Sequence, residues 1–213
     1  MISNYDRSYF IGGSDTRYVM AKNQQTKTWQ RWFAIKCGLD DSLFAGNEAT
    51  RLGNIFEHPI LKAVNPLVNI DRQLIVPKYN LRVNYDGDYN GTIYEVKTHR
   101  GDKEFEITSG YYGQAQAEMF CWKQYLKDSE RYQDWHIREH IEPFNELYIV
   151  SYGLDIEEYS RVEEYESGER QVVIDKDRIK LHKVKYDKGF ISEYKPRLKQ
   201  IAKLIRNGDG IPW

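Results

Sequence analysis

The sequence contains few of the residues that define several classes of protein. Only two of its 213 residues are cysteines, and Cys37 and Cys121 lie far apart and in no motif. Two cysteines cannot build a disulfide framework, a four-cysteine zinc site or an iron–sulfur cluster. We therefore expect both side chains to be reduced, partly buried thiols.

Long apolar runs and repeats are also missing. No stretch approaches the ~20 apolar residues of a membrane-spanning helix, and the opening residues, MISNYDRSYF, show no charged-then-apolar signal pattern. No internal repeat, low-complexity tract or linker divides the chain. With 40% apolar and 30% charged residues, the composition is typical of a globular protein. We expect a single domain over residues 1–213, in the cytoplasm of a bacterial host cell.

The net charge of −1 conceals an uneven distribution of charge. Residues 1–38 carry a net charge of +4 and residues 176–206 carry +8, whereas residues 39–175 carry −12. Such a distribution fits basic surfaces that hold phosphates around an acidic, cation-binding centre. Solvated helix faces would explain it equally well.

The order of helix and strand patterns predicts an α/β (α+β) domain in which a mixed β-sheet is flanked by helices. Its N-terminal part, residues 1–65, is mainly helical; residues 70–155 form the core, and residues 156–213 hold a hairpin and a basic helix. The expected helices cover residues 28–38, 46–64, 109–127 and 189–206, and the expected strands cover 73–77, 81–87, 92–98 and 145–155. The first three strands should form an antiparallel meander.

Glycine-containing turns add two local predictions. The pair Gly12-Gly13 is followed by Ser14, which we expect to cap a helix. The segment 160–174 has the pattern of a hairpin that turns at Ser167-Gly168.

The segment 85–98, YDGDYNGTIYEVKT, contains the residues that point to chemistry. Alternate residues of a strand share a face, so Glu95 and Lys97 point the same way. A hairpin through Asn90-Gly91 would bring Asp86 alongside Glu95. Buried carboxylates require a partner or a cation, and Mg²⁺ or Mn²⁺ prefers carboxylate oxygens. Lys97 should stay protonated beside them and position water. A surface hairpin with a Glu–Lys pair is the alternative for this pattern alone.

Five landmarks occur in an order that resembles one family of nucleases. They are Arg7 followed by a glycine-rich turn with Ser14, G-x-x-x-E at Gly53–Glu57, D-G at Asp86-Gly87, E-x-K at Glu95–Lys97, and Q-x-Q at Gln114–Gln116. With these landmarks the chain resembles the lambda-exonuclease-like, or YqaJ-type, phage recombination nucleases of the PD-(D/E)xK superfamily. This resemblance implies a core like that of restriction endonucleases. It also implies Mg²⁺-dependent (Mn²⁺ being the alternative) 5′→3′ degradation of linear double-stranded DNA.

The resemblance also implies roles for individual residues. Asp86, Glu95 and the main-chain carbonyl of Val96 would hold one metal ion, and Glu57 would help Asp86 to hold a second. Gln116, and with it Gln114, would lie beside the metal site. Arg7 and Ser14 would grip a 5′ phosphate. The family further implies a homo-trimer and a single-strand annealing protein as partner.

Some features depart from the family pattern or point elsewhere. Tyr85 precedes Asp86 where the superfamily has proline, and Asp88 is an alternative ligand. His136 and His140 have the spacing of zinc ligands on a helix, but no third ligand is near, so we favour exposed helix residues. Two other functions share the core pattern: an endonuclease of restriction or junction-resolving type, and a non-catalytic DNA-binding module.

Overall fold

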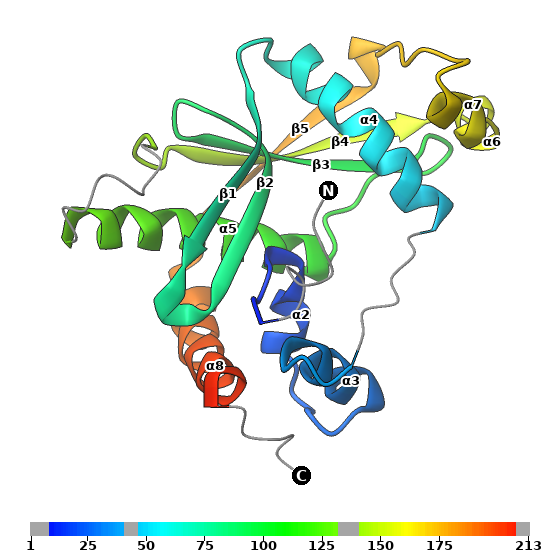
Figure 1. Cartoon of the computed structure of the whole chain (residues 1–213). Coiled ribbons are helices and arrows are strands. Elements are labelled where there is room, and N and C mark those ends of the chain that lie inside the picture. Colours follow the sequence, from blue (N-terminus) through cyan, green and yellow to red (C-terminus); the bar gives the residue numbers. More distant parts are fainter. Residues whose placement is uncertain (1–8, 41–46, 132–140, 208–213) are drawn as a thin grey trace.

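A computed structural model describes residues 9–40, 47–131 and 141–207. Five strands form a single sheet in the order β1-β2-β3-β4-β5, and helices cover both of its faces (Figure 1). The strands are β1 (Asn69–Val76), β2 (Leu81–Tyr89), β3 (Thr92–Arg100), β4 (Glu146–Leu154) and β5 (Ile179–Val184). The pairs β1–β2, β2–β3 and β4–β5 are antiparallel, and β3–β4 is parallel. This confirms the predicted mixed sheet and its antiparallel meander.

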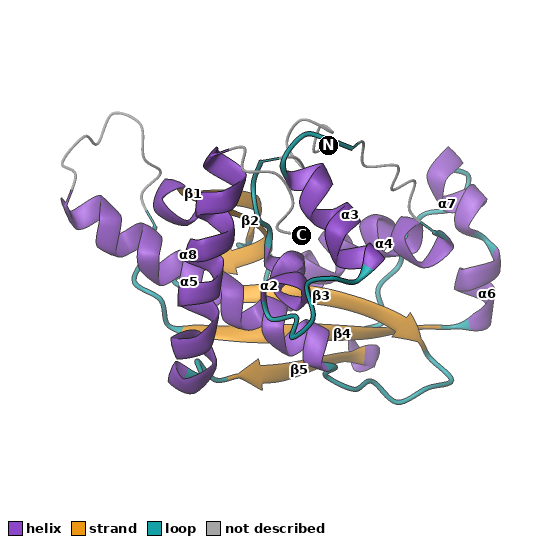
Figure 2. Ribbon diagram, turned by 90° about the horizontal axis from the view of Figure 1, so that it is seen from below, coloured by secondary structure: helices purple, strands orange, loops and turns teal. Residues whose placement is uncertain are grey.

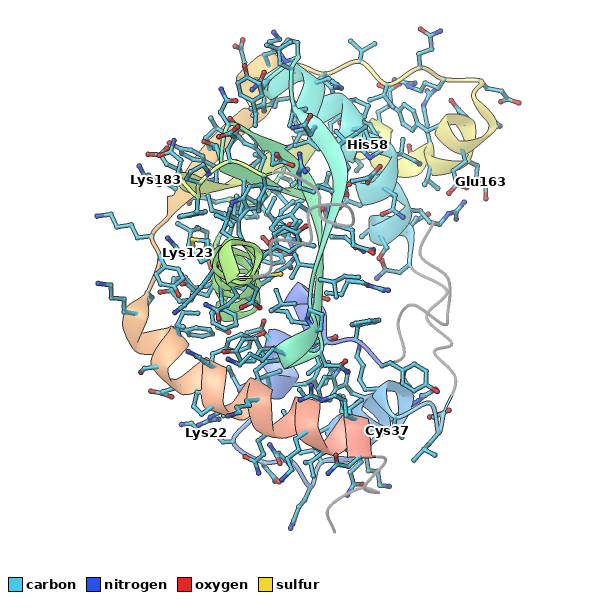
Figure 3. All side chains as sticks on the ribbon, turned by 60° about the vertical axis from the view of Figure 1, so that its left-hand side comes forward. Lys22, Cys37, His58, Lys123, Glu163 and Lys183 are labelled. Atoms are coloured by element: carbon cyan, nitrogen blue, oxygen red, sulfur yellow. The ribbon has the colours of Figure 1, made fainter. Side chains whose placement is uncertain are left out.

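The parallel pair β3–β4 requires a crossover, which α5 (Ser109–Arg131) provides. On the other face of the sheet, α4 (Glu48–Val64) packs against β3 and β2. Figure 3 looks almost along α5, and there Lys123 on α5 and His58 on α4 lie on opposite sides of the sheet. In the described part of the chain, no helix is both long and apolar enough to cross a membrane.

The sheet separates two apolar clusters. On the α5 side, strand residues such as Leu74, Tyr85 and Ile149 pack with helix residues that include Phe120 and Trp122. On the α4 side, the members are Leu52, Phe56, Ile60, Leu61, Val68, Val96, Val150, Tyr152, Leu154 and Val162. Alternate residues of the strands enter alternate clusters, as the twofold periodicity of a strand requires.

The remaining N-terminal and C-terminal helices pack on the α5 side of the sheet (Figure 2). They are α2 (Thr16–Val19), α3 (Lys27–Lys36) and α8 (Lys188–Asn207). The apolar stripe predicted for α3 is buried, and Lys36 within it donates to the carbonyl of Phe10 at 2.7 Å and contacts Asp15 at 2.8 Å. This ion pair explains how a lysine is accommodated on a buried helix face.

The predicted cap at Ser14 is wrong. A 3-10 turn, η1 (Gly13–Asp15), precedes α2, and Ser14 is an exposed residue inside that turn. Gly12 occupies the N-cap position, and its backbone N–H donates to Asp15 Oδ2 at 2.8 Å. The carboxylate that satisfies the free N–H group is therefore the one after Ser14.

The predicted hairpin over residues 160–174 is also wrong. That region contains the short helices α6 (Ile156–Ser160) and α7 (Val162–Ser167), and Gly168, at φ 79°, ends α7. Asp155 and Glu158 form a capping box at the start of α6, and glutamates in the first turns favour a helix start. The prediction also missed β5, an edge strand in which Lys180, His182 and Lys183 interrupt the apolar pattern.

Candidate active site

The site begins where β2 and β3 separate. Their ladder runs from Tyr89–Thr92 to Gly87–Tyr94 and stops there, although both strands continue. Asp86 and Glu95 are the first residues beyond the last pair. Asp86 Oδ2 accepts a hydrogen bond from the backbone N–H of Val96 at 2.8 Å. A carboxylate thus replaces the missing ladder partner at the point of separation.

Neighbouring segments stabilise this separation. At the start of β2, Ile11 pairs with Leu81 in a parallel bridge. The N-terminal segment therefore pairs with the edge of β2 from which β3 has separated. Gly87 follows Asp86, and a Cβ added there would lie 2.8 Å from side-chain atoms of both Leu61 and Val68. The D-G motif therefore combines a charged residue in the opening with a residue that lets α4 approach closely.

Glu95 and Lys97 point to the α5 side, as the strand alternation predicts. Lys97 Nζ lies 2.5 Å from Glu95 Oε1, and Glu95 is 3% exposed. From α5, the side-chain amide of Gln114 donates to Glu95 Oε1 at 2.6 Å and to Glu118 Oε1 at 2.9 Å. Glu118, which the sequence analysis missed, is thereby joined to the predicted pair.

Glu57 approaches the opening from α4. Its neighbour His58 contacts Glu57 at 3.9 Å and Asp71 at 3.1 Å. Asp71 lies between the residues of β1 that pair with Gly87 and Tyr85, and it has φ 58°. The opening between β2 and β3 thus brings carboxylates from both faces of the sheet toward one place.

Burial and mutual repulsion raise the pKa values of three carboxylic acids at the opening, Asp86, Glu118 and Glu57. Burial, Glu95 and Glu57 together hold the pKa of Asp86 well above its usual range. Burial, Glu95 and Asp86 do the same for the pKa of Glu118. Burial and Glu95 raise the pKa of Glu57 from 4.5 to about 7. Burial lowers the pKa of Lys97, but Glu95 and Asp86 outweigh this effect and raise it overall, so its ammonium keeps its proton.

The donor set fits a hard divalent cation. Glu95 Oε2 and Glu118 Oε2 are buried and have no hydrogen-bond partner among the residues that the structure describes. Buried carboxylate oxygens without partners are costly, and Mg²⁺ or Mn²⁺ is the partner that such oxygens prefer. Asp86 and Glu57 stand beside them with raised pKa values. A bound cation would relieve both the repulsion and the unpaired oxygens.

Gln116 does not join this cluster. Its amide nitrogen donates to the carbonyl of Lys185 at 2.8 Å, and its oxygen accepts from the N–H of Asp187 at 2.9 Å. Residues two apart on a helix point in different directions, whereas Gln114 and Glu118, four apart, share a face. We therefore correct the expectation that Gln116 lies at the metal site: it holds the connection between β5 and α8. The spacing of four from Gln114 was the signal for Glu118.

The other predicted residues fall into three groups. Ser14 follows Gly13, where an added Cβ would lie 3.2 Å from Glu118 Oε1, so the turn adjoins the carboxylate cluster. Asp88 is buried in an ion pair with Arg72 at 2.5 Å, which makes it a poor substitute for Asp86. Arg7, His136 and His140 lie outside the described residues.

Solved structures of exonucleases share the fold of this chain. The alkaline exonuclease LHK-Exo from Laribacter hongkongensis superposes with a TM-score of 0.62 at 13% identity, over 96% of this chain and 91% of that chain. Its complex with dAMP gives 0.61 at 13% identity over the same shares of the two chains.

A phage-related exonuclease from Haemophilus somnus 129PT superposes with a TM-score of 0.57 at 14% identity, over 93% of this chain and 94% of that one. No family model and no curated protein matches the sequence. At these identities the likeness defines the fold alone, and the chain shares the fold of these three structures. The predicted fold class is confirmed, and the fold agrees with the family that the sequence motifs resemble.

Proposed function

We propose that the protein is a metal-dependent exonuclease of the phage recombination type, which degrades linear double-stranded DNA 5′→3′ and leaves 3′ single strands. One observation carries this proposal. Asp86, Glu95 and Lys97 meet where β2 and β3 separate, in a buried site where carboxylate oxygens have no hydrogen-bond partner among the described residues. A DNA-binding module without activity has no need to bury such charges.

In this proposal, Asp86, Glu95 and the Val96 carbonyl hold one Mg²⁺ ion, with Mn²⁺ as the alternative, and Glu57 and Asp86 hold a second. Such ions lower the pKa of bound water and offset charge on the scissile phosphate. Lys97, whose pKa is raised, acts as a protonated group that orients water and stabilises negative charge. Gln114 keeps Glu95 in position through its 2.6 Å hydrogen bond.

The preference for DNA ends rests on the N-terminal turn. Gly13 lies against Glu118, so a 5′ phosphate bound at Ser14 would sit next to the hydrolytic site. We propose that Arg7 grips the same phosphate. Backbone N–H groups at such a turn suit an anion. The fold relatives include an exonuclease crystallised with dAMP. We further propose that the protein works as a homo-trimer with a single-strand annealing protein.

Digestion of linear and covalently closed circular DNA tests the activity. Linear duplex should be degraded in Mg²⁺, circles should survive, and a chelator should stop the reaction. Equal cutting of circles and linear DNA would instead support an endonuclease. Glu95→Ala and Lys97→Ala should abolish cleavage and leave DNA binding largely intact. Undiminished digestion by these variants would refute the site.

A further inference from the structure

Glu118 is held side by side with Glu95 by a single amide group. Gln114 Nε2 donates to Oε1 of both glutamates, at 2.6 Å and 2.9 Å. Each carboxylate therefore has one oxygen occupied, and in each the second oxygen, Oε2, is buried without a hydrogen-bond partner among the described residues. Two unsatisfied oxygens thus lie in one cluster, one on each neighbouring side chain.

Glu118 is also too buried for an unpaired glutamate. It is 1% exposed, and full burial of a glutamate is rare unless a partner neutralises it. The ammonium of Lys97 lies 2.5 Å from Glu95 Oε1, and that oxygen also accepts from Gln114. Once ionised, the four carboxylates of Glu57, Asp86, Glu95 and Glu118 exceed the charge that Lys97 can balance.

The residues around Glu118 hold its side chain in place, but those described give its Oε2 atom no hydrogen-bond partner. The hydroxyl of Tyr85 donates to the main-chain carbonyl of Glu118 at 2.9 Å, which anchors this turn of α5 to β2. A Cβ added at Gly13 would lie 3.2 Å from Glu118 Oε1 and 3.4 Å from its Cγ, so the N-terminal turn closes over the side chain. Glu118 is consequently preorganised, with Oε2 left open.

We propose that Glu118 is a further carboxylate of the cation site, which binds a divalent ion through Oε2, directly or through a coordinated water. This inference rests on the proposed function, because it extends the metal site from the strands and α4 to α5. A purely structural role would need only the hydrogen bond from Gln114, which a glutamine at position 118 can also accept.

Binding of Mn²⁺ alone, measured by calorimetry and by electron paramagnetic resonance of the free ion, separates these roles. Glu118→Gln keeps the size and the acceptor but removes the charge. We expect the Kd for Mn²⁺ to rise about 10–100-fold, the range found when groups that support metal ligands are changed. The rise in Tm on adding Mn²⁺ should shrink accordingly.

Glu158→Gln is the matched control. Glu158 in α6 is also a buried glutamate, at 6% exposure, but it forms an ion pair with Arg178. This variant should bind Mn²⁺ as the wild type does. If circular dichroism finds Glu118→Gln unfolded, Glu118→Asp replaces it. That variant withdraws the carboxylate by one methylene and should also weaken binding.

The outcomes distinguish this inference from the proposed function. An unchanged Mn²⁺ affinity in the folded Glu118 variant, together with lost affinity in Asp86→Asn, overturns the role of Glu118 and leaves the metal site intact. Unchanged affinity in Asp86→Asn and Glu95→Gln as well removes the metal site itself, and the proposed nuclease activity with it.

Discussion

At the scale of single residues, two glutamines two positions apart have different tasks. Gln114 holds Glu95 and Glu118 together, and Gln116 ties the carbonyl of Lys185 and the N–H of Asp187. Sequence identity to the Q-x-Q motif does not separate them, because both are amides on one helix. The two side chains differ in the direction in which they leave α5, and this difference separates their roles.

Replacing Gln114 by alanine should therefore mainly lower activity, whereas replacing Gln116 should mainly lower stability. Gln114→Ala should lower the cleavage rate about 10–100-fold, since it loosens two carboxylates of the site, with a small effect on stability. Gln116→Ala removes the side-chain partner of two partly buried backbone groups and should reduce the free energy of unfolding by about 0.5–1.5 kcal/mol. Urea unfolding and DNA digestion of both variants give the comparison. Equal losses of activity at equal stability would contradict it.

The end preference is a residue-scale prediction too. Arg7→Ala should reduce the advantage of 5′-phosphorylated over unphosphorylated linear DNA by roughly tenfold or more, because a charge-assisted phosphate contact contributes about 1.5–3 kcal/mol. Competition between the two substrates measures the ratio directly. Arg17→Ala, at an exposed arginine whose guanidinium lies over the ring of Tyr18, is the control. A ratio unchanged in Arg7→Ala rules out the role.

At the scale of elements, the site depends on two strands that part and a helix that packs closely behind them. Gly87 permits the approach of α4, since its missing Cβ would meet Leu61 and Val68 at 2.8 Å. Gly53 on α4 itself faces no such conflict: an added Cβ would lie 3.6 Å from Thr98 Oγ1, an ordinary contact. Close packing therefore requires glycine at position 87, whereas no steric conflict requires it at position 53.

Alanine at these two positions should change stability in opposite directions. Gly87→Ala should destabilise the fold by about 1–3 kcal/mol through overpacking, and should lower activity by displacing Asp86. Gly53→Ala should be neutral or stabilise by up to about 1 kcal/mol, because alanine favours a helix interior more than glycine does. Chemical denaturation is the measurement. A stable Gly87→Ala protein would argue against the close packing.

At the scale of the whole molecule, folding and cation binding are coupled through charge. The folded protein gathers the carboxyl groups of Glu57, Asp86 and Glu118, whose pKa values are raised by burial and repulsion. A raised pKa means that the folded chain retains protons which the unfolded chain releases. Stability from these groups therefore falls as pH rises.

Glu57 sets the interval for a test, because its pKa moves from 4.5 to about 7. In a chelator, the free energy of unfolding of Glu57→Gln minus that of the wild type should increase between pH 5 and pH 8, by on the order of 1–3 kcal/mol. Saturating Mg²⁺ should diminish or reverse the difference. Taking the difference removes titrations common to both proteins. A difference independent of pH, or one that decreases, would contradict the coupling.

The features of the fold and the site that could be predicted from the sequence are those fixed by residues close together in the chain. Strand alternation placed Glu95 and Lys97 on one face, and the helix and strand patterns gave the mixed sheet, since both follow from backbone geometry within a few residues. The helices α6 and α7 were missed because a glycine that ends a helix and one that turns a hairpin look alike. Strand β5 was missed because three of its six residues, Lys180, His182 and Lys183, are polar and break the apolar alternation.

The amino-acid sequence by itself determined the main helices and the first four strands, the face that Glu95 and Lys97 share, and the D-G and E-x-K residues at the opening. Only the tertiary structure decided that β2 and β3 separate after Gly87–Tyr94, that Glu118 joins the carboxylates, and that Gln116 does not. The physical reason is distance along the chain. Periodicity orients a side chain on its own element, but which side chains meet depends on how α4, α5 and the N-terminal turn pack on the sheet.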